Sequence, residues 1–132
     1  MKLTINTLIE TQAAMNAIGN TKLPNPAAYR MAKNLNLINT QMKALEDKRV
    51  NLLNSMVANG SAKLSDDKSR FEFIPPENEK GFNDTMNDYK QTEVDLPLMS
   101  FTLEEMGPNP IEPLILAALD KLGIIETPAL NS

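Results

Sequence analysis

The sequence predicts an α+β fold dominated by helices: an N-terminal helical hairpin with one long helix, a small two-stranded element and two shorter helices. Three observations lead to this prediction. An apolar ladder in the first half of the chain repeats at helical spacing, helix start and stop signals flank it, and two stretches in the second half alternate between polar and apolar residues. A chain of 132 residues has the usual size of one domain.

The apolar ladder defines the long helix. Its positions follow alternating steps of four and three residues, and all but one are apolar: Met31, Leu35, Ile38, Met42, Leu45, Leu52 and Met56, with Arg49 in the one slot where the rule breaks. This heptad seam is typical of a helix that packs one face against another helix. Asn25 and Pro26 suit the N-cap and the first helical position, and Asn59-Gly60 suits a left-handed stop. We therefore expect one helix between these signals.

The predicted helix is longer than a compact domain of this chain. About 34 residues at 1.5 Å per residue span roughly 50 Å, whereas a compact chain of this size has a diameter of roughly 36 Å. The first helix covers only about 20 Å of that length. Either the C-terminal half of the chain or another chain covers the rest. We take the eight seam residues as the candidate interaction site.

Capping and alternation place the first helix and the strands. Thr7-x-x-Glu10 fits a capping box that opens the first helix at Thr7, and Gly19-Asn20 ends it. The stretches 70–74 and 93–101 alternate like strands, and a proline interrupts the second.

Helical spacing places the two shorter helices. Phe82, Met86 and Tyr89 predict a helix over 78–91. Thr102-x-x-Glu105 is a second capping box and opens a single turn. The last helix begins at Asn109-Pro110 and closes at Gly123, with Ile124 placed for the apolar contact after the stop. Its apolar side is assigned to Ile111, Leu114, Ile115, Ala118 and Leu122.

These elements suggest one compact unit with four parts. The helical hairpin spans 1–60, a polar linker 61–69, a small α/β element that packs on the hairpin 70–125, and a tail 126–132.

The composition argues against catalysis and against cofactor or metal binding. The chain has no Cys and no His, so it cannot build a catalytic triad, a thiolate nucleophile or an imidazole-based zinc site. The phosphate-binding patterns GxxxxGK[ST] and GxGxxG are absent. The pairs Asp66-Asp67 and Glu104-Glu105 do not form a metal site, since adjacent side chains point apart. We expect a protein that is not an enzyme, without a cofactor or metal.

The charge is unevenly distributed along the chain. Residues 1–60 hold seven basic and three acidic residues, a balance of +4, and residues 61–132 hold six and fourteen, a balance of −8. The basic half has one aromatic residue and its charges are dispersed, which is unlike a nucleic-acid-binding surface. We expect the halves to attract each other within the fold or between subunits.

No membrane segment or secretory signal is expected. The longest apolar run, 114–119, is far shorter than the ~20 residues of a membrane span. The first sixteen residues lack an apolar stretch long enough for a signal peptide.

Two features of the seam allow more than one interpretation. Arg49 either specifies a partner or register, or extends its guanidinium to solvent, where Glu46 lies one turn back. Met31, Met42 and Met56 form either core packing or an adaptable binding stripe.

Short motifs along most of residues 3–122 resemble small proteins of tailed bacteriophages whose function is uncharacterised. The motifs are Lys22-Leu23-Pro24, Ala28-Tyr29, Ala32-Lys33-Asn34, Glu46-x-x-Arg49, Phe82…Tyr89 and Glu93-Val94-Asp95-Leu96. The resemblance implies a phage accessory or virion component, supplies no active-site residues, and suggests a structural role for the Glu46/Arg49 pair.

Together these inferences predict a non-enzymatic phage protein–protein interaction module. It acts in virion assembly or structure through the long helix, as a homo-oligomer or part of a larger assembly, in the host cytoplasm during infection or in the virion. Its partner is itself, another phage protein or a host protein. The alternative is a small phage effector that binds a host or immune protein to inhibit or trigger it.

Overall fold

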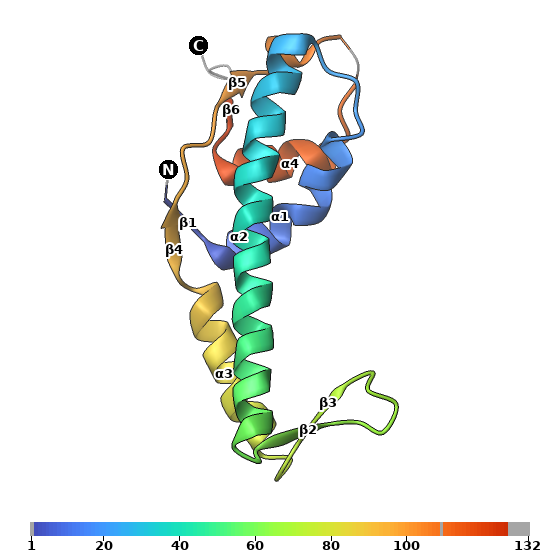
Figure 1. The fold of residues 1–132 in the computed structure, drawn as a ribbon. Helices are drawn as coiled ribbons and strands as arrows, with labels where there is room; N and C mark the ends of the chain where they lie inside the picture. Colours follow the sequence, from blue (N-terminus) through green and yellow to red (C-terminus); the bar gives the residue numbers. More distant parts are fainter. Residues whose placement is uncertain (1, 109, 127–132) are drawn as a thin grey trace. The chain divides into compact units, whose positions relative to one another are not determined.

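The computed structural model describes residues 2–108 and 110–126. Within these ranges the elements follow one another as β1 (Lys2–Thr4), α1 (Ile5–Ile18), α2 (Asn25–Ala58), β2 (Ala62–Leu64), β3 (Phe71–Phe73), α3 (Asn78–Lys90), β4 (Glu93–Asp95), β5 (Phe101–Thr102), a 3₁₀ turn (Glu104–Met106), α4 (Pro113–Leu122) and β6 (Ile125–Glu126) (Figure 1). Helices predominate and each sheet has two strands, so the predicted helix-dominated α+β class is confirmed.

The chain divides into two compact units. Unit 1 is drawn from residues 1–42 and from residues 93 onward, and unit 2 is residues 43–92. The sequence-based boundaries at 60 and 70 do not coincide with this division, because α2 contributes residues to both units.

The helix α1 begins earlier than Thr7. The Oγ1 of Thr4 accepts a hydrogen bond from the Thr7 backbone N–H at 3.1 Å, so Thr4 is the N-cap. The predicted start was wrong because Thr4 meets the same capping requirement one turn earlier, where β1 ends. The buried side of α1 includes the predicted Leu8, Met15 and Ile18.

The helix α2 runs between the two predicted signals. After its last turn, the Ser61 N–H donates to the carbonyl of Met56 at 2.8 Å, and the Gly60 N–H donates to that of Val57 at 3.2 Å. This is a Schellman motif, and it requires the positive φ of 83° that Gly60 adopts.

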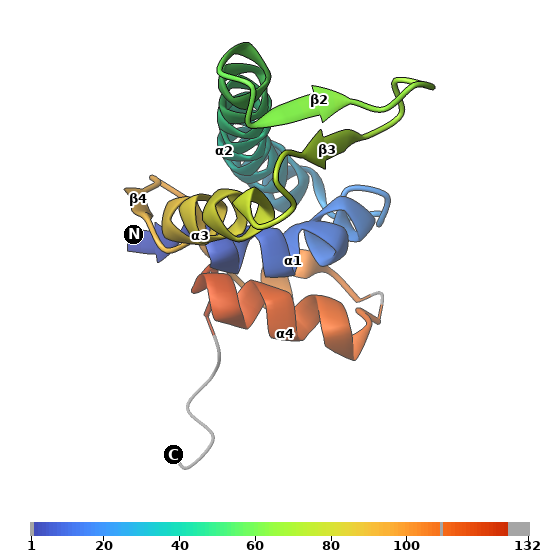
Figure 2. The same ribbon diagram turned by 90° about the horizontal axis from the view of Figure 1, so that it is seen from below.

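The core of unit 1 forms where α4 lies alongside α1, as both ribbon views show (Figures 1 and 2). The buried side of α4 consists of Ile115, Ala118, Leu119 and Leu122. Leu114, assigned to this side from the sequence, is instead 80% exposed, because the helix begins at Pro113 and its apolar stripe is turned toward Leu119. Asn109 lies outside the described residues.

The predicted stop of α4 is confirmed. Gly123 adopts a left-handed φ of 73°, and the Ile124 N–H donates to the Leu119 carbonyl at 3.1 Å. The Ile124 side chain is buried, as expected of the apolar residue that follows such a stop.

Two small sheets complete unit 1. In the antiparallel pair β1–β4, Leu3 lies opposite Val94, and in the parallel pair β5–β6, Phe101 lies opposite Ile125. The strand expected over 93–101 is thus two strands, separated at the segment that contains Pro97, which has no N–H to donate. Glu126, expected in the tail, belongs to β6; the rest of the predicted tail, 127–132, lies outside the described residues.

Unit 2 contains an antiparallel hairpin, β2–β3, in which Ala62 lies opposite Phe73. The segment 61–69 is therefore largely part of this hairpin, and its prediction as a linker was wrong because its polar residues form the turn. The rings of Phe73 and Phe82 have centroids 5.4 Å apart, which joins the hairpin to α3. The Nζ of Lys48, on α2, lies 5.0 Å from the ring centroid of Tyr89, on α3.

Asn34 joins α2 to the segment between β4 and β5. Its Nδ2 donates to the Met99 carbonyl at 2.9 Å, and its Oδ1 accepts from the Met99 N–H at 2.7 Å. The side chain is fully buried, at 0% exposure. Both backbone groups of Met99 are thereby satisfied at a point where the chain is not in a sheet.

We expect Asn34→Ala to lower the free energy of unfolding by about 1–3 kcal/mol, because it removes both hydrogen bonds between the buried Asn34 side chain and the Met99 backbone. Urea denaturation measures the loss. Asn36→Ala, at an exposed position of the same helix, is the matched control and should change stability little. Equal effects of the two substitutions would contradict this role of Asn34.

Asp67 organises the turn of the β2–β3 hairpin. Its Oδ1 accepts hydrogen bonds from the Ser65 Oγ at 2.6 Å, the Ser69 Oγ at 2.7 Å and the Ser69 N–H at 3.0 Å. These bonds, that of the Ser65 hydroxyl first, lower the pKa of Asp67 from 3.8 to about 2.

Because the pKa of Asp67 is lower in the folded hairpin, its carboxylate should stabilise the turn fully above pH 3.8 and lose that contribution as the pH falls through about 2. NMR titration of the Asp67 carboxyl carbon measures this pKa. The double substitution Ser65→Ala with Ser69→Ala should raise it toward 3.8, since both hydroxyl donors are removed. An unchanged midpoint would show that the hydroxyls do not hold the carboxylate.

Candidate interaction surface

The structure buries two of the eight predicted seam residues of α2 and leaves the others partly exposed. Met31 and Ile38 are core residues of unit 1, with 2% and 1% of their surface exposed. At these two positions the chain itself covers the seam, and neither side chain is available to a partner. The other six seam residues are half-buried: Leu35, Met42, Leu45, Arg49, Leu52 and Met56.

Part of the seam is covered by α1. At Gly19, just after α1, an added Cβ would lie only 3.3 Å from the Cδ1 of Leu35. The small residue therefore permits a close approach of the chain to α2, as expected of the predicted hairpin.

Arg49 makes the contact that the sequence suggested. Its Nε donates to the Glu46 Oε2 at 2.9 Å, and its Nη2 donates to the Oε1 at 2.5 Å. This fork-like pair lowers the pKa of Glu46 and raises that of Arg49. Both side chains remain substantially exposed, so the pair lies on the surface of the helix.

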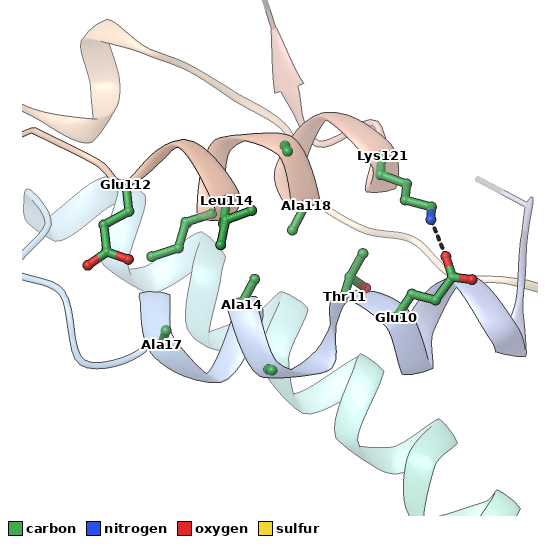
Figure 3. Close-up of a pocket in the computed structure, with 11 residues that line it drawn as sticks. Glu10, Thr11, Ala14, Ala17, Glu112, Leu114, Ala118 and Lys121 are labelled. Carbon is green, nitrogen blue, oxygen red and sulfur yellow. Dashed lines mark hydrogen bonds and ion pairs between the residues drawn. The ribbon is translucent and has the colours of Figure 1, made fainter.

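A groove lies between α1 and α4 in unit 1. Its volume is about 480 Å³, and it is lined by Glu10, Thr11, Ala13, Ala14, Ala17, Glu112, Leu114, Ile115, Ala117, Ala118 and Lys121. Most of these side chains are apolar and five are alanines. We call it the α1–α4 groove (Figure 3).

The two ends of the α1–α4 groove differ in charge. At one end the Nζ of Lys121 donates to the Oε2 of Glu10, an interaction that lowers the pKa of that carboxyl. Glu112 lies at the other end. Leu114, on α4, lies across the groove from Ala14 and Ala17 on α1 (Figure 3). The groove is thus an apolar surface bounded by charged groups.

A further hollow lies between α2 and the segment that Asn34 holds. Its volume is about 600 Å³, and it is lined by Lys33, Asn36, Leu37, Thr40, Pro97 and Met99. We call it the Met99 hollow. The Nζ of Lys33 lies 5.1 Å from the ring centroid of Tyr29, an exposed aromatic residue one turn earlier on α2.

Arg30 and Glu105 form a structural contact between α2 and the 3₁₀ turn. Arg30 Nη1 donates to Glu105 Oε2 at 2.5 Å, and the N–H groups of Thr102 and Glu105 complete the predicted capping box. The hydrogen bond from the Thr102 N–H, followed by that from Arg30, lowers the pKa of Glu105. Such a carboxylate is a poor proton donor at neutral pH.

In the part of the chain that the structure describes, no three His, Cys, Asp or Glu residues are grouped so that they could hold a metal ion. Over the same residues, no helix combines the length and apolar character needed to cross a membrane.

Sequence reasoning missed the roles of Asn34 and Leu114. Asn34 lies between the buried Met31 and Ile38 at helical spacing, so its place on the buried side of α2 was a usable signal. For Leu114 no signal was present, because its spacing from Ala118 and Leu122 fits the apolar side.

No protein-family model, curated protein sequence or solved structure matches this chain.

We expect Arg49→Leu to change the free energy of unfolding by no more than about 0.5 kcal/mol, or to raise it, because the lost ion pair is exposed and a leucine fits the seam. The oligomeric state should stay the same. Thermal unfolding and light scattering measure the two quantities, with Glu46→Gln as the control that removes only the charge of the partner. An altered oligomeric state would instead assign Arg49 a role in partner choice.

Proposed function

We propose that this protein is a non-enzymatic protein–protein interaction module of a tailed bacteriophage that acts in virion assembly or structure. The phage setting rests on the resemblance of the short motifs along residues 3–122. The mode of action rests on the surface of unit 1, which is described next.

The observation that carries the proposal is the apolar lining of the α1–α4 groove and the Met99 hollow. Leu114 and Met99 are both exposed large apolar side chains and each lines one of the two. Exposed apolar side chains grouped around a hollow favour contact with another macromolecule.

The electrostatics support binding rather than catalysis. Each carboxylate with a shifted pKa has that pKa lowered by a cap, an ion pair or a turn: Glu10, Glu46, Asp67 and Glu105. A general acid at neutral pH needs the opposite shift, usually through burial among apolar groups.

The acidic balance of residues 61–132 supports a second candidate, a small effector that binds a host or immune protein. Six basic and fourteen acidic residues give this segment a charge of −8. Such a surface attracts basic partners and resembles nucleic acid electrostatically. The two candidates differ in where the protein is found and in what it contacts.

We expect the protein to be present in purified virions or assembly intermediates and to cross-link there to a phage structural protein. Quantitative mass spectrometry of virions and of infected-cell fractions measures this distribution. Met99→Ser should reduce incorporation, because it removes an apolar side chain from the Met99 hollow.

The matched control is Val57→Ser, which changes an equally exposed side chain in unit 2. Absence from virions and intermediates, together with a stable complex with a host protein, would refute the assembly role and establish the effector role.

A further inference from the structure

We propose that the α1–α4 groove is the contact face of a symmetric dimer, in which Leu114 of each copy packs onto the alanines of the other copy's α1. The partner is then a second copy of the same chain, and in this respect the inference rests on the proposed function.

The first argument is the position of Leu114. It is the most exposed large apolar side chain among the described residues, with 80% of its surface accessible. It belongs to the outward edge of α4 together with Ala117 and Lys121, at spacings of three and four residues. It does not belong to the buried side of α4, which includes Ile115 and Leu119.

The second argument is the surface opposite Leu114. The outward edge of α1 carries Ala13, Ala14 and Ala17, so methyl groups are the largest side chains along this stretch. We call these three residues the alanine shelf. A protruding leucine and a shallow shelf on one surface are complementary in shape, and a surface that carries both is complementary to itself.

The third argument concerns the symmetry axis. The helices α1 and α4 run in opposite directions, with Glu10 beside Lys121 at one end of the groove and Leu114 opposite Ala14 and Ala17 toward the other (Figure 3). A two-fold axis parallel to the helices places α1 of one copy against α4 of the other. It leaves each residue at the same height along the axis. It therefore places Leu114 of each copy above the alanine shelf of the other.

The charges support the same axis. The rotation brings the Glu10–Lys121 pairs of the two copies together, so that two acidic and two basic groups alternate around the axis. An axis perpendicular to the helices would instead place Leu114 level with Lys121 of the second copy, an apolar group against a charge. The axis parallel to the helices is therefore the one that matches apolar groups with apolar groups and opposite charges with each other.

Sedimentation equilibrium over a range of protein concentrations tests the dimer. The wild-type chain should dimerise, and Leu114→Ser and Ala17→Arg should each weaken association by about tenfold or more, since one removes the inserted group and the other blocks the shelf. Both positions are exposed, so folding is expected to survive, and circular dichroism checks this. Leu103→Ser, at another exposed leucine of unit 1, is the matched control and should leave association unchanged.

Disulfide trapping tests the axis, since the natural chain has no cysteine. A mixture of the single variants Leu114→Cys and Ala17→Cys should yield an oxidised heterodimer, whereas each variant alone should yield far less. A mixture of Leu103→Cys and Ala17→Cys should not cross-link.

A wild-type chain that stays monomeric, or a dimer that neither Leu114→Ser nor Ala17→Arg weakens, would overturn the inference. A monomer that still cross-links to a phage structural protein in virions would overturn the dimer alone and leave the proposed function intact. A protein that dimerises with the expected cross-link but is absent from virions and assembly intermediates would support the dimer and overturn the proposed function.

Discussion

The side chain of Asn34 is the interaction on which the arrangement of unit 1 depends. The helix α2 and the segment between β4 and β5 are far apart in the sequence, and the segment carries Pro97, so it cannot continue as a strand with a full set of backbone hydrogen bonds. The amide of Asn34 pairs with both backbone groups of Met99. Because a carboxamide carries an N–H donor and a C=O acceptor that point to the same side, it can pair with both backbone groups of one residue, as a neighbouring strand does.

The position of the Met99 hollow follows from this contact. Met99 is held by its backbone, which leaves its side chain free to line the surface beside Pro97 and Leu37. Arg30, one turn before Asn34, reaches the carbonyl of Ser100 and the carboxylate of Glu105. A short stretch of one helix thus fixes the path of the chain from β4 to the 3₁₀ turn with polar contacts, while Met31 and Ile38 supply the apolar ones.

Much of the secondary structure was predictable because it depends on local chemistry. The end of α2 at Gly60, the capping box of Thr102 and Glu105, and the stop of α4 at Gly123 are each determined by residues within one turn. The start of α1 was missed because two threonines, Thr4 and Thr7, both satisfy the local rule, and only the strand before Thr4 decides between them.

The surface was less predictable, because side-chain exposure depends on contacts between distant segments. The heptad pattern placed Met31 and Ile38 on the packed face of α2 but could not tell that unit 1 itself covers them. The same periodicity placed Leu114 on the packed side of α4, although Leu119 takes that position. Periodicity identifies a face, whereas the neighbour that covers the face is set by tertiary packing.

The order in which the two units occur along the chain affects folding during synthesis. Unit 2 is one continuous stretch, whereas unit 1 requires two stretches separated by the whole of unit 2. A ribosome therefore releases every residue of the β2–β3 hairpin and α3 before it makes α4. Until then α1 lacks α4, the helix that packs alongside it in the finished unit. Bringing α4 back to α1 closes a long loop, which has an entropic cost. Prior folding of unit 2 would shorten that loop, so the second unit would assist the first through chain entropy alone.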